Sequence, residues 1–246
     1  MEIRVCKDKI ALGQSAADYT AYLLNQAIKE KGSARIVLST GASQFDTITA
    51  LVDADVDWSK VEMFHLDEYV DLPETHIASF RKYLKERFVS KVNLKAAYFV
   101  DGTAEGIKRL TEEIRKSPVD VGLIGIGENA HIAFNDPPAD FDTKDAYIIV
   151  NLNETCKKQQ VGEGWFATVD DVPKQAVSMS VYQIMQCKHI ISCVPYPVKA
   201  NAIQATLEND VTNTVPATIM KTHPNFILYI DSDSFAQVCA KEILWK

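Results

Sequence analysis

Short apolar runs alternate with helical patterns along the chain. Runs that are rich in β-branched and other apolar residues are predicted to be strands. They comprise residues 35–39, 61–65, 119–126, 176–181, 189–194 and 226–230. These runs are almost continuous in apolar character, which is typical of strands that are covered on both faces of a sheet.

Between these runs, apolar residues recur at a spacing that places them on one side of a helix. Helices are predicted over residues 17–28, 45–52, 80–88, 106–114, 198–207 and 235–244. This alternation indicates βαβ units. We therefore predict a single α/β domain over residues 1–246, with a Rossmann-like, doubly wound, mostly parallel sheet and helices on both faces. Ligands of such sheets bind beyond the carboxyl ends of the strands, so candidate chemistry is sought directly after each strand.

The composition is that of an ordinary globular protein, with 47% apolar and 24% charged residues. A net charge of −7 and the lack of a Lys/Arg stripe argue against nucleic acid as a partner, although one pocket can still be locally positive. No apolar run approaches the ~20 residues of a membrane span. The charged start, MEIRVCKD, differs from a secretory signal. We expect no membrane partner and a cytoplasmic location.

The cysteines form no recognisable disulfide or metal-binding pattern. Their number is odd, and no C-x-x-C pair occurs. We therefore expect buried, inert thiols. They are Cys6, Cys156, Cys187, Cys193 and Cys239.

The first loop of interest, residues 39–43, reads STGAS and lies between a predicted strand and a predicted helix. Its small residues allow a ligand to approach the backbone closely, and the start of the helix offers N–H groups with positive partial charge. The hydroxyls of Thr40 and Ser43 add donors. The loop is a candidate phosphate cradle; the alternative is a tight turn with Ser43 as helix N-cap. It lacks the signatures of a P-loop and of G-x-G-x-x-G.

The second loop follows the strand at residues 61–65 and contains two adjacent acids, Asp67 and Glu68. Neighbouring side chains there cannot point the same way, so one acid can face a pocket while the other makes a structural contact. A carboxylate with a tuned pKa serves as a general base. The alternative is a solvated acidic loop.

The third loop follows the strand at residues 119–126 and reads GENAHIAFNDPP over residues 127–138. His131 lies among small residues, with Glu128 and Asp136 nearby. Because histidine titrates near neutral pH, it suits proton transfer at sugar oxygens. A purely structural histidine is the alternative.

The sequence motifs give little support for a metal site or for a serine-hydrolase site. The other histidines are scattered, and neither H-x-x-x-H nor H-E-x-x-H occurs. The G-x-S-x-G element of a Ser-His-Asp hydrolase is also absent. We therefore expect no metal and no cofactor.

Several segments of these loops match motifs of a known family. Residues 64–73, FHLDEYVDLP, look like a family block M-D-E-Y-V-G-L-P, and residues 125–135, GIGENAHIAFN, are similar to G-x-G-x-D-G-H-I-A-F-N-E. Residues 38–43 resemble a T-G-x-T/S phosphate loop. Lys199 and the pair His223-Pro224 fall where the family has a late lysine and a histidine-proline pair. The chain thus resembles the glucosamine-6-phosphate deaminase/isomerase family, which is related to 6-phosphogluconolactonases, over roughly residues 35–230.

The resemblance implies an enzyme that turns an amino-sugar phosphate into fructose 6-phosphate and ammonia, classed here as a hydrolase. His131 would help to open the sugar ring, and Asp67 would move a proton from C2 to C1 through an enolamine. Proton transfer and hydrogen bonds suffice for this chemistry without a cofactor. The phosphosugar would be bound by Thr40, Gly41, Ala42, Ser43, Glu68, Lys157, Lys158 and Lys199.

The chain departs from the family pattern around the histidine. Asn129 stands where the deaminases carry the aspartate that partners the histidine, and Glu128 is a candidate for supplying that carboxylate instead. Asp136 replaces a glutamate, and Ala130 replaces a glycine. The catalytic candidates are therefore Asp67, Glu128, Asn129, His131 and Asp136.

The family's phosphate-binding arginine after the third loop is not evident. Residues 156–166, CKKQQVGEGWF, fill that region. Lys157 or Lys158 could replace the arginine as a point charge without its bidentate geometry, or both could lie on a solvated helix face.

Other activities stay open at this point. A 6-phosphogluconolactonase shares the fold, but its segment usually runs H-T-A-S-L-F-P, whereas residues 131–136 read HIAFND. Another phosphosugar isomerase, for example one acting on galactosamine 6-phosphate, is a second alternative. The third is a non-catalytic sugar-phosphate sensor, motivated by Asn129 and the absent arginine. The sequence leaves the oligomeric state, including a homo-oligomer, open.

Overall fold

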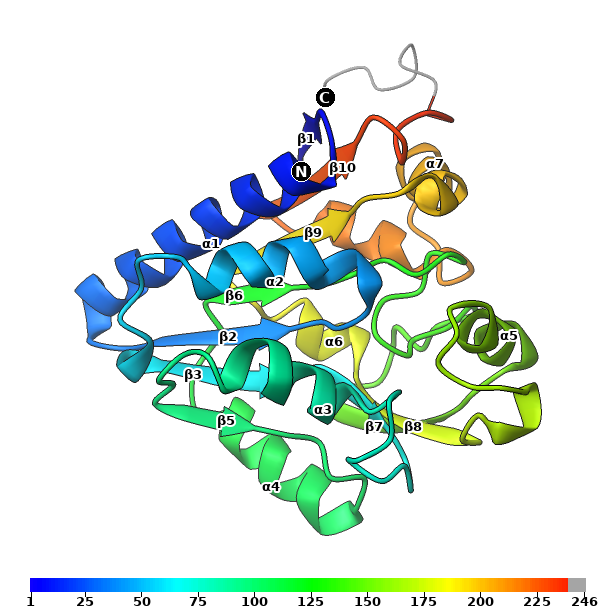
Figure 1. Ribbon diagram of the computed structural model, residues 1–246, viewed down its shortest axis with the longest axis horizontal. Coiled ribbons are helices and arrows are strands. Elements are labelled where there is room, and N and C mark those ends of the chain that lie inside the picture. The colour runs from blue at the N-terminus through cyan, green and yellow to red at the C-terminus, as the bar shows by residue number, and fades with distance from the viewer. Residues whose placement is uncertain (239–246) are drawn as a thin grey trace.

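The computed structural model describes residues 1–238, and its centre is a seven-stranded parallel sheet (Figure 1). All neighbouring strands in this sheet are parallel. In spatial order the strands are β1 (Glu2–Cys6), β10 (Phe226–Asp231), β9 (His189–Val194), β6 (Val121–Leu123), β2 (Ala34–Leu38), β3 (Val61–His65) and β5 (Ala96–Tyr98).

Helices cover both faces of the sheet because its strands are apolar on both sides. Ile36 and Leu38 of β2 pack into the core under α1 (Lys9–Lys31), α2 (Phe45–Val52) and α3 (Phe80–Leu84), which continues as a π-helical turn at Lys85–Val89. Val37, between them, faces the opposite core under α4 (Ala104–Ile114), α6 (Val181–Ile184) and α7 (Ala200–Glu208). This alternation has the two-residue period of a strand. The predicted α/β fold is confirmed.

The order of the strands reverses between β2 and β6. From β2 the chain builds outward through β3 and β5, then returns to the other side of β2 as β6 and continues outward through β9 and β10. Leu38 of β2 pairs with Leu123 of β6, so the two strands end side by side. A doubly wound sheet binds its ligands at such a switch point.

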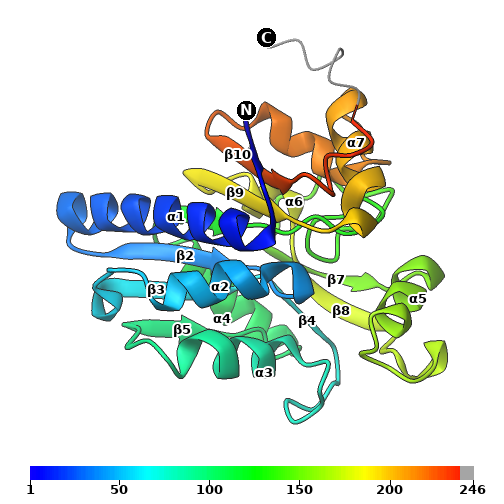
Figure 2. The same ribbon diagram turned by 45° about the horizontal axis from the view of Figure 1, so that its top comes forward.

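A second, antiparallel sheet comprises β4 (Asp67–Tyr69), β8 (Gln175–Met179) and β7 (Tyr147–Asn151). Figure 2 shows that it and α5 (Glu154–Gly162) extend beyond the ends of the main strands. The predicted strand at residues 176–181 therefore belongs to this sheet and not to the parallel one. It is buried on both faces, because Val177 and Met179 face the core of α4 and α6, while Ala176 faces a small core around Tyr69.

The remaining differences concern edges and ends. Strands β1, β4, β5 and β7 were not predicted, and β1 and β5 are the half-exposed edges of the main sheet. Helix α1 is longer than predicted because Asp8 caps its start, accepting from the N–H of Ala11 at 2.8 Å, and Gly32 ends it with φ of 79°. Of the predicted helix at residues 235–244, residues 235–238 form turns, and the rest lies outside the described residues. No helix within residues 1–238 combines the length and apolarity needed to cross a bilayer.

Candidate active site

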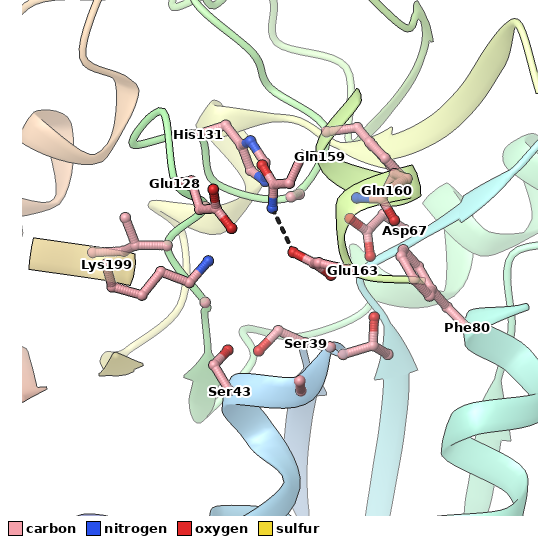
Figure 3. A pocket seen from close by; sticks show the side chains of 18 of the residues that line it. Ser39, Ser43, Asp67, Phe80, Glu128, His131, Gln159, Gln160, Glu163 and Lys199 are labelled. Carbon is pink, nitrogen blue, oxygen red and sulfur yellow. Dashed lines mark hydrogen bonds between the residues drawn. The ribbon is translucent and has the colours of Figure 1, made fainter. Parts of the chain in front are cut away.

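A cavity of about 180 Å³ lies at the switch point of the main sheet (Figure 3). The loops that follow β2, β3, β6 and β9 line it from below and from the sides, and the end of α5 closes the remaining side. All three loops singled out in the sequence meet here because the carboxyl ends of parallel strands share one edge of the sheet.

The loop after β2 contributes all five of its residues, Ser39 to Ser43, to the cavity wall. Gly41 adopts φ of 100°, a conformation that favours glycine. A single helical turn at Ala42–Gln44 follows and leads into α2. Ser43 does not cap this helix, since Gln44 holds that position and no side chain caps the turn. The backbone N–H groups at the start of the turn thus have no side-chain partner and can meet an anion.

Asp67 lies at the start of β4, directly beyond β3, and its carboxyl group faces the cavity (Figure 3). Only 6% of the residue is exposed. Burial, assisted by the nearby charge of Glu68, raises the pKa of Asp67 from 3.8 to about 8. A carboxyl group whose pKa lies near neutral pH both accepts and returns a proton, as a general base that shuttles one must.

Glu68 points away from the cavity, which corrects its prediction as a substrate-binding residue. Alternation along β4 turns its side chain into the protein, where it is fully buried. Its carboxylate accepts from the Ser79 hydroxyl at 2.9 Å and from the backbone N–H of Arg81 at 2.8 Å, and the Arg81 guanidinium lies 3.3 Å away. Glu68 therefore anchors the start of α3. One acid faces the cavity and the other makes a structural contact, as expected from the sequence, and the loop is not a solvated acidic one.

His131 reaches the cavity from the loop after β6 and is paired with Asp136. Its Nδ1 lies 3.1 Å from Oδ1 of Asp136, a close ion-pair contact without the alignment of a hydrogen bond. Asn129 braces both groups: its amide nitrogen donates to Asp136 at 3.0 Å, and its oxygen accepts from the backbone N–H of His131 at 3.2 Å. Burial opposes the charge of Asp136, but the contacts with His131 and Asn129 outweigh it and lower the pKa of Asp136.

Asp136 is thus the carboxylate partner of His131, and the prediction that Glu128 supplies that carboxylate is wrong. Glu128 lines the cavity farther along, where it acts electrostatically on Lys199 (Figure 3). The replacement of aspartate by Asn129 therefore leaves the histidine with a full charge beside it, because the loop brings Asp136 back to the ring.

Two small residues give the third loop its shape. A Cβ atom on Gly127 would lie 2.2 Å from the His131 ring, so only glycine leaves room for the ring in this position. Ala130 has φ of 63°, in the left-handed region that favours glycine. The glycine that the family motif carries at this position suits that conformation better than alanine does.

Lys199 extends from the turn before α7 into the cavity, and it is 7% exposed (Figure 3). Burial lowers its pKa, an effect that the carboxylates of Glu163 and Glu128 partly offset. Lys157, in contrast, lines no part of the cavity and lies 3.7 Å from Glu154 on its own helix, which corrects its prediction as a substrate-binding residue. Lys158 borders an adjoining hollow that shares Glu128 and Glu163 with the main cavity.

Sequence reasoning missed several residues of the cavity wall. Most come from the end of α5 and the turn after it, and one comes from α3. Helix α5 is held over the cavity by a hydrogen bond of 2.7 Å from the Tyr69 hydroxyl to the Gln160 side chain. No motif marks these positions; the only signal was that residues 156–166 occupy the place of an expected arginine. The missed residues include Phe80, Gln159, Gln160, Glu163, Trp165 and Tyr196.

The family model named Glucosamine-6-phosphate isomerases/6-phosphogluconolactonase matches residues 7–228 of the chain. The chain belongs to this family. The family expected from the sequence motifs is therefore confirmed. Curated relatives include the glucosamine-6-phosphate deaminase of Staphylococcus epidermidis, 36% identical over 232 residues, which cover 89% of this chain and 93% of the relative. The glucosamine-6-phosphate deaminase of Oenococcus oeni is 31% identical over 245 residues, covering 98% of this chain and all of the relative.

Solved structures of the family have the same fold. A monomeric glucosamine-6-phosphate deaminase of the NagB superfamily superimposes with a TM-score of 0.87 at 26% identity, covering 96% of this chain and 99% of that one. A 6-phosphogluconolactonase from Shewanella baltica gives a TM-score of 0.78 at 19% identity, with 94% and 98% covered, and shares the fold alone. The chain thus spans nearly the full length of these proteins.

Proposed function

We propose that the protein is an aldose–ketose isomerase and deaminase that converts glucosamine 6-phosphate and water to fructose 6-phosphate and ammonia. The observation that carries the proposal is the arrangement of two proton-transfer groups around one cavity. Asp67 and the His131–Asp136 pair reach it from different strands. The names of the relatives at 31–36% identity support deamination, and they give no support for the hydrolase label.

Ring opening is assigned to His131 and Asp136. Opening a pyranose requires a proton to reach the ring oxygen while the hydroxyl at C1 loses one, which gives the open aldehyde. His131 moves these protons, and the negative charge of Asp136 stabilises the imidazolium form at 3.1 Å. Asn129 holds the carboxylate and the backbone of the histidine in place and acts as a positioning residue.

Asp67 is assigned the isomerisation step. Its carboxylate removes the proton from C2 of the open sugar while the aldehyde oxygen takes a proton from the substrate's own ammonium group, which gives an enolamine with a hydroxyl at C1. The carboxylic acid then delivers the proton to C1, so that C2 becomes an imine. Water adds to C2 and ammonia leaves, which yields the ketose. A pKa of about 8 matches this alternation between base and acid near neutral pH.

The phosphate is assigned to the loop after β2 and to Lys199. The backbone N–H groups of Ala42 and Ser43 and the hydroxyls of Thr40 and Ser43 supply donors, and Lys199 supplies a charge. Hydrogen bonds of this kind to a charged group are among the strong ones. We propose a phosphosugar ligand without a cofactor; a homo-oligomer and a cytoplasmic location stay predictions.

The test is ammonia release from glucosamine 6-phosphate, with fructose 6-phosphate measured in the same reaction. Both products should appear in equal amounts, and Asp67→Asn should abolish them. If fructose 6-phosphate and ammonia both fail to form, the proposal is wrong. Hydrolysis of 6-phosphogluconolactone, assayed in parallel, distinguishes the lactonase, for which the structural neighbours below 25% identity provide only the fold.

A further inference from the structure

The carbonyl group of Gly41, in the loop after β2, is held from outside the cavity. The hydroxyl of Tyr83 donates to its oxygen at 3.1 Å, and the backbone N–H of Gln44 donates to the same oxygen at 3.1 Å. Tyr83 belongs to α3 and does not line the cavity, whereas Phe80, one turn earlier in the helix, does. The oxygen of Gly41 therefore points out of the cavity and toward α3.

The direction of this carbonyl group sets the direction of the next amide group. The peptide bond between Gly41 and Ala42 is trans, because the one cis bond within residues 1–238 lies elsewhere. In a planar trans peptide the C=O and N–H bonds point in opposite directions. With the oxygen turned toward Tyr83, the N–H of Ala42 is turned toward the cavity that this residue lines. Because Ala42 is the first residue of its helical turn, this N–H has no partner within the turn.

A buried cation shares the cavity with this amide group. The side chain of Lys199 lies inside the wall, yet its ammonium group makes no hydrogen bond or ion pair within residues 1–238. Figure 3 shows the side chains of Lys199 and Ser43 pointing into the same space from different walls. A buried charge without a partner is costly, so this end of the cavity is suited to an anion.

Tyr83 is itself fixed by packing, so its hydroxyl is a donor at a defined place. Its buried ring stacks on Phe45, the first residue of α2, with the ring centroids 5.6 Å apart, and the Arg87 guanidinium lies over the Phe45 ring. The start of α3 is anchored by Glu68, which accepts from the Ser79 hydroxyl at 2.9 Å. Helix α3 is thus tied to the segment after β3 at its start and to the loop after β2 near its end.

We propose that Tyr83 is a positioning residue for the phosphate group of the substrate, because it aims the N–H of Ala42 into the cavity. Its hydroxyl stabilises the orientation of the Gly41–Ala42 peptide in which the donor faces the anion. In the opposite orientation the carbonyl oxygen, an acceptor, would face the phosphate and leave it without a partner there. The inference rests on the proposed function for the identity of the ligand. It adds a residue that contacts neither the sugar nor the phosphate.

The experiment measures dissociation constants by calorimetry for glucosamine 6-phosphate and for inorganic phosphate, at neutral pH and constant salt. Each protein carries Asp67→Asn so that bound sugar is not consumed. Tyr83→Phe removes the hydroxyl and keeps the ring that stacks on Phe45. Tyr229→Phe is the matched control, because Tyr229 is also buried and its hydroxyl accepts from Arg4 away from the cavity.

Tyr83→Phe should weaken binding of both ligands by roughly fivefold, the size expected for the loss of one neutral hydrogen bond. With Asp67 intact, the same substitution should raise KM for glucosamine 6-phosphate by a similar factor. It should leave kcat within about twofold of its original value, because the proton-transfer groups are untouched. Tyr229→Phe should change none of these constants, even where it lowers the melting temperature.

The proposal is overturned if Tyr83→Phe binds inorganic phosphate as tightly as its parent protein, or if the parent protein does not bind phosphate at all. A fall in kcat with an unchanged KM would also overturn it, because the hydroxyl would then act on the chemistry and not on the phosphate. Failure of the proposed reaction appears in ammonia release by the unaltered enzyme, whereas phosphate binding tests Tyr83 without any turnover.

Discussion

Replacing Asp67 by asparagine is expected to stabilise the protein while it removes activity. Burial holds the pKa of this carboxyl at about 8 in the folded protein, whereas its ordinary value is 3.8. Between these values the unfolded chain has lost the proton and the folded protein keeps it. The stability that Asp67 contributes is therefore complete below about pH 4 and is lost as the pH rises through about 8. An amide at this position does not titrate in the folded or in the unfolded protein. Asp67→Asn therefore avoids this loss of stability.

The size of the effect follows from the linkage between pKa and stability. Each unit of pKa difference corresponds to about 1.4 kcal/mol, so between about pH 5 and pH 8 the unaltered protein loses at most ~4 kcal/mol relative to Asp67→Asn. Asp67 borders a cavity that water can enter, which weakens the penalty on its charge. We therefore expect Asp67→Asn to exceed the unaltered protein in free energy of unfolding by about 2 kcal/mol at about pH 8. This difference should grow steadily as the pH rises to that value.

The assay is urea unfolding of both proteins at several pH values, followed by circular dichroism. The free energy of unfolding of Asp67→Asn should exceed that of the unaltered protein at about pH 8, and the two should converge below about pH 4. Asp55→Asn, an exposed control, should show no such divergence. A difference that stays constant with pH would refute the raised pKa, and with it the assignment of Asp67 as a base tuned to neutral pH.

Three further outcomes test the other groups of the site. Asp136→Asn should lower kcat by roughly 100-fold, because His131 loses the charge that stabilises its imidazolium form. Gly127→Ala should also lower kcat by about 10-fold or more, because the new methyl group occupies the space of the His131 ring; an unchanged kcat would show that the ring position is not critical. Lys199→Ala should raise KM for glucosamine 6-phosphate at least ~10-fold, whereas Lys157→Ala, which lies outside the cavity, should leave KM unchanged.

The main sheet was largely predictable because its central strands are buried on both faces. The strands at residues 61–65 and 189–194 were predicted residue for residue, since most of their residues are apolar and buried. The edges escaped prediction because β5 has three half-buried residues and β1 alternates between exposure and partial burial. The strand at residues 176–181 was assigned to the wrong sheet, because a short antiparallel sheet between two cores carries the same apolar signal as a central parallel strand.

The site was predictable where its residues follow strands of the main sheet. It was not predictable where its residues depend on how α5 packs against the rest of the domain. Asp67 and His131 follow strands, and the topology of a doubly wound sheet brings them together. The sequence could not show which of the two acids, Asp67 or Glu68, faces the cavity. The alternation of side chains along β4 decides this. Gln159 and Glu163 could not be found either, since α5 is placed by contacts with residues distant in the chain, among them the hydrogen bond between Gln160 and Tyr69 and the apolar packing of Cys156.

The pairing of β1 with β10 has a consequence for synthesis of the chain. Residues 2–6 lie against residues 226–231, and the Arg4 guanidinium donates to the Tyr229 hydroxyl at 2.6 Å across this seam. On the ribosome, β2, β3, β5 and β6 emerge in an order that lets them pair as they appear, but β1 must wait for almost the whole chain. Contacts of such long sequence separation form late. A segment made long before its partner is thus among the last to pair, and until then it remains available to chaperones and to other chains.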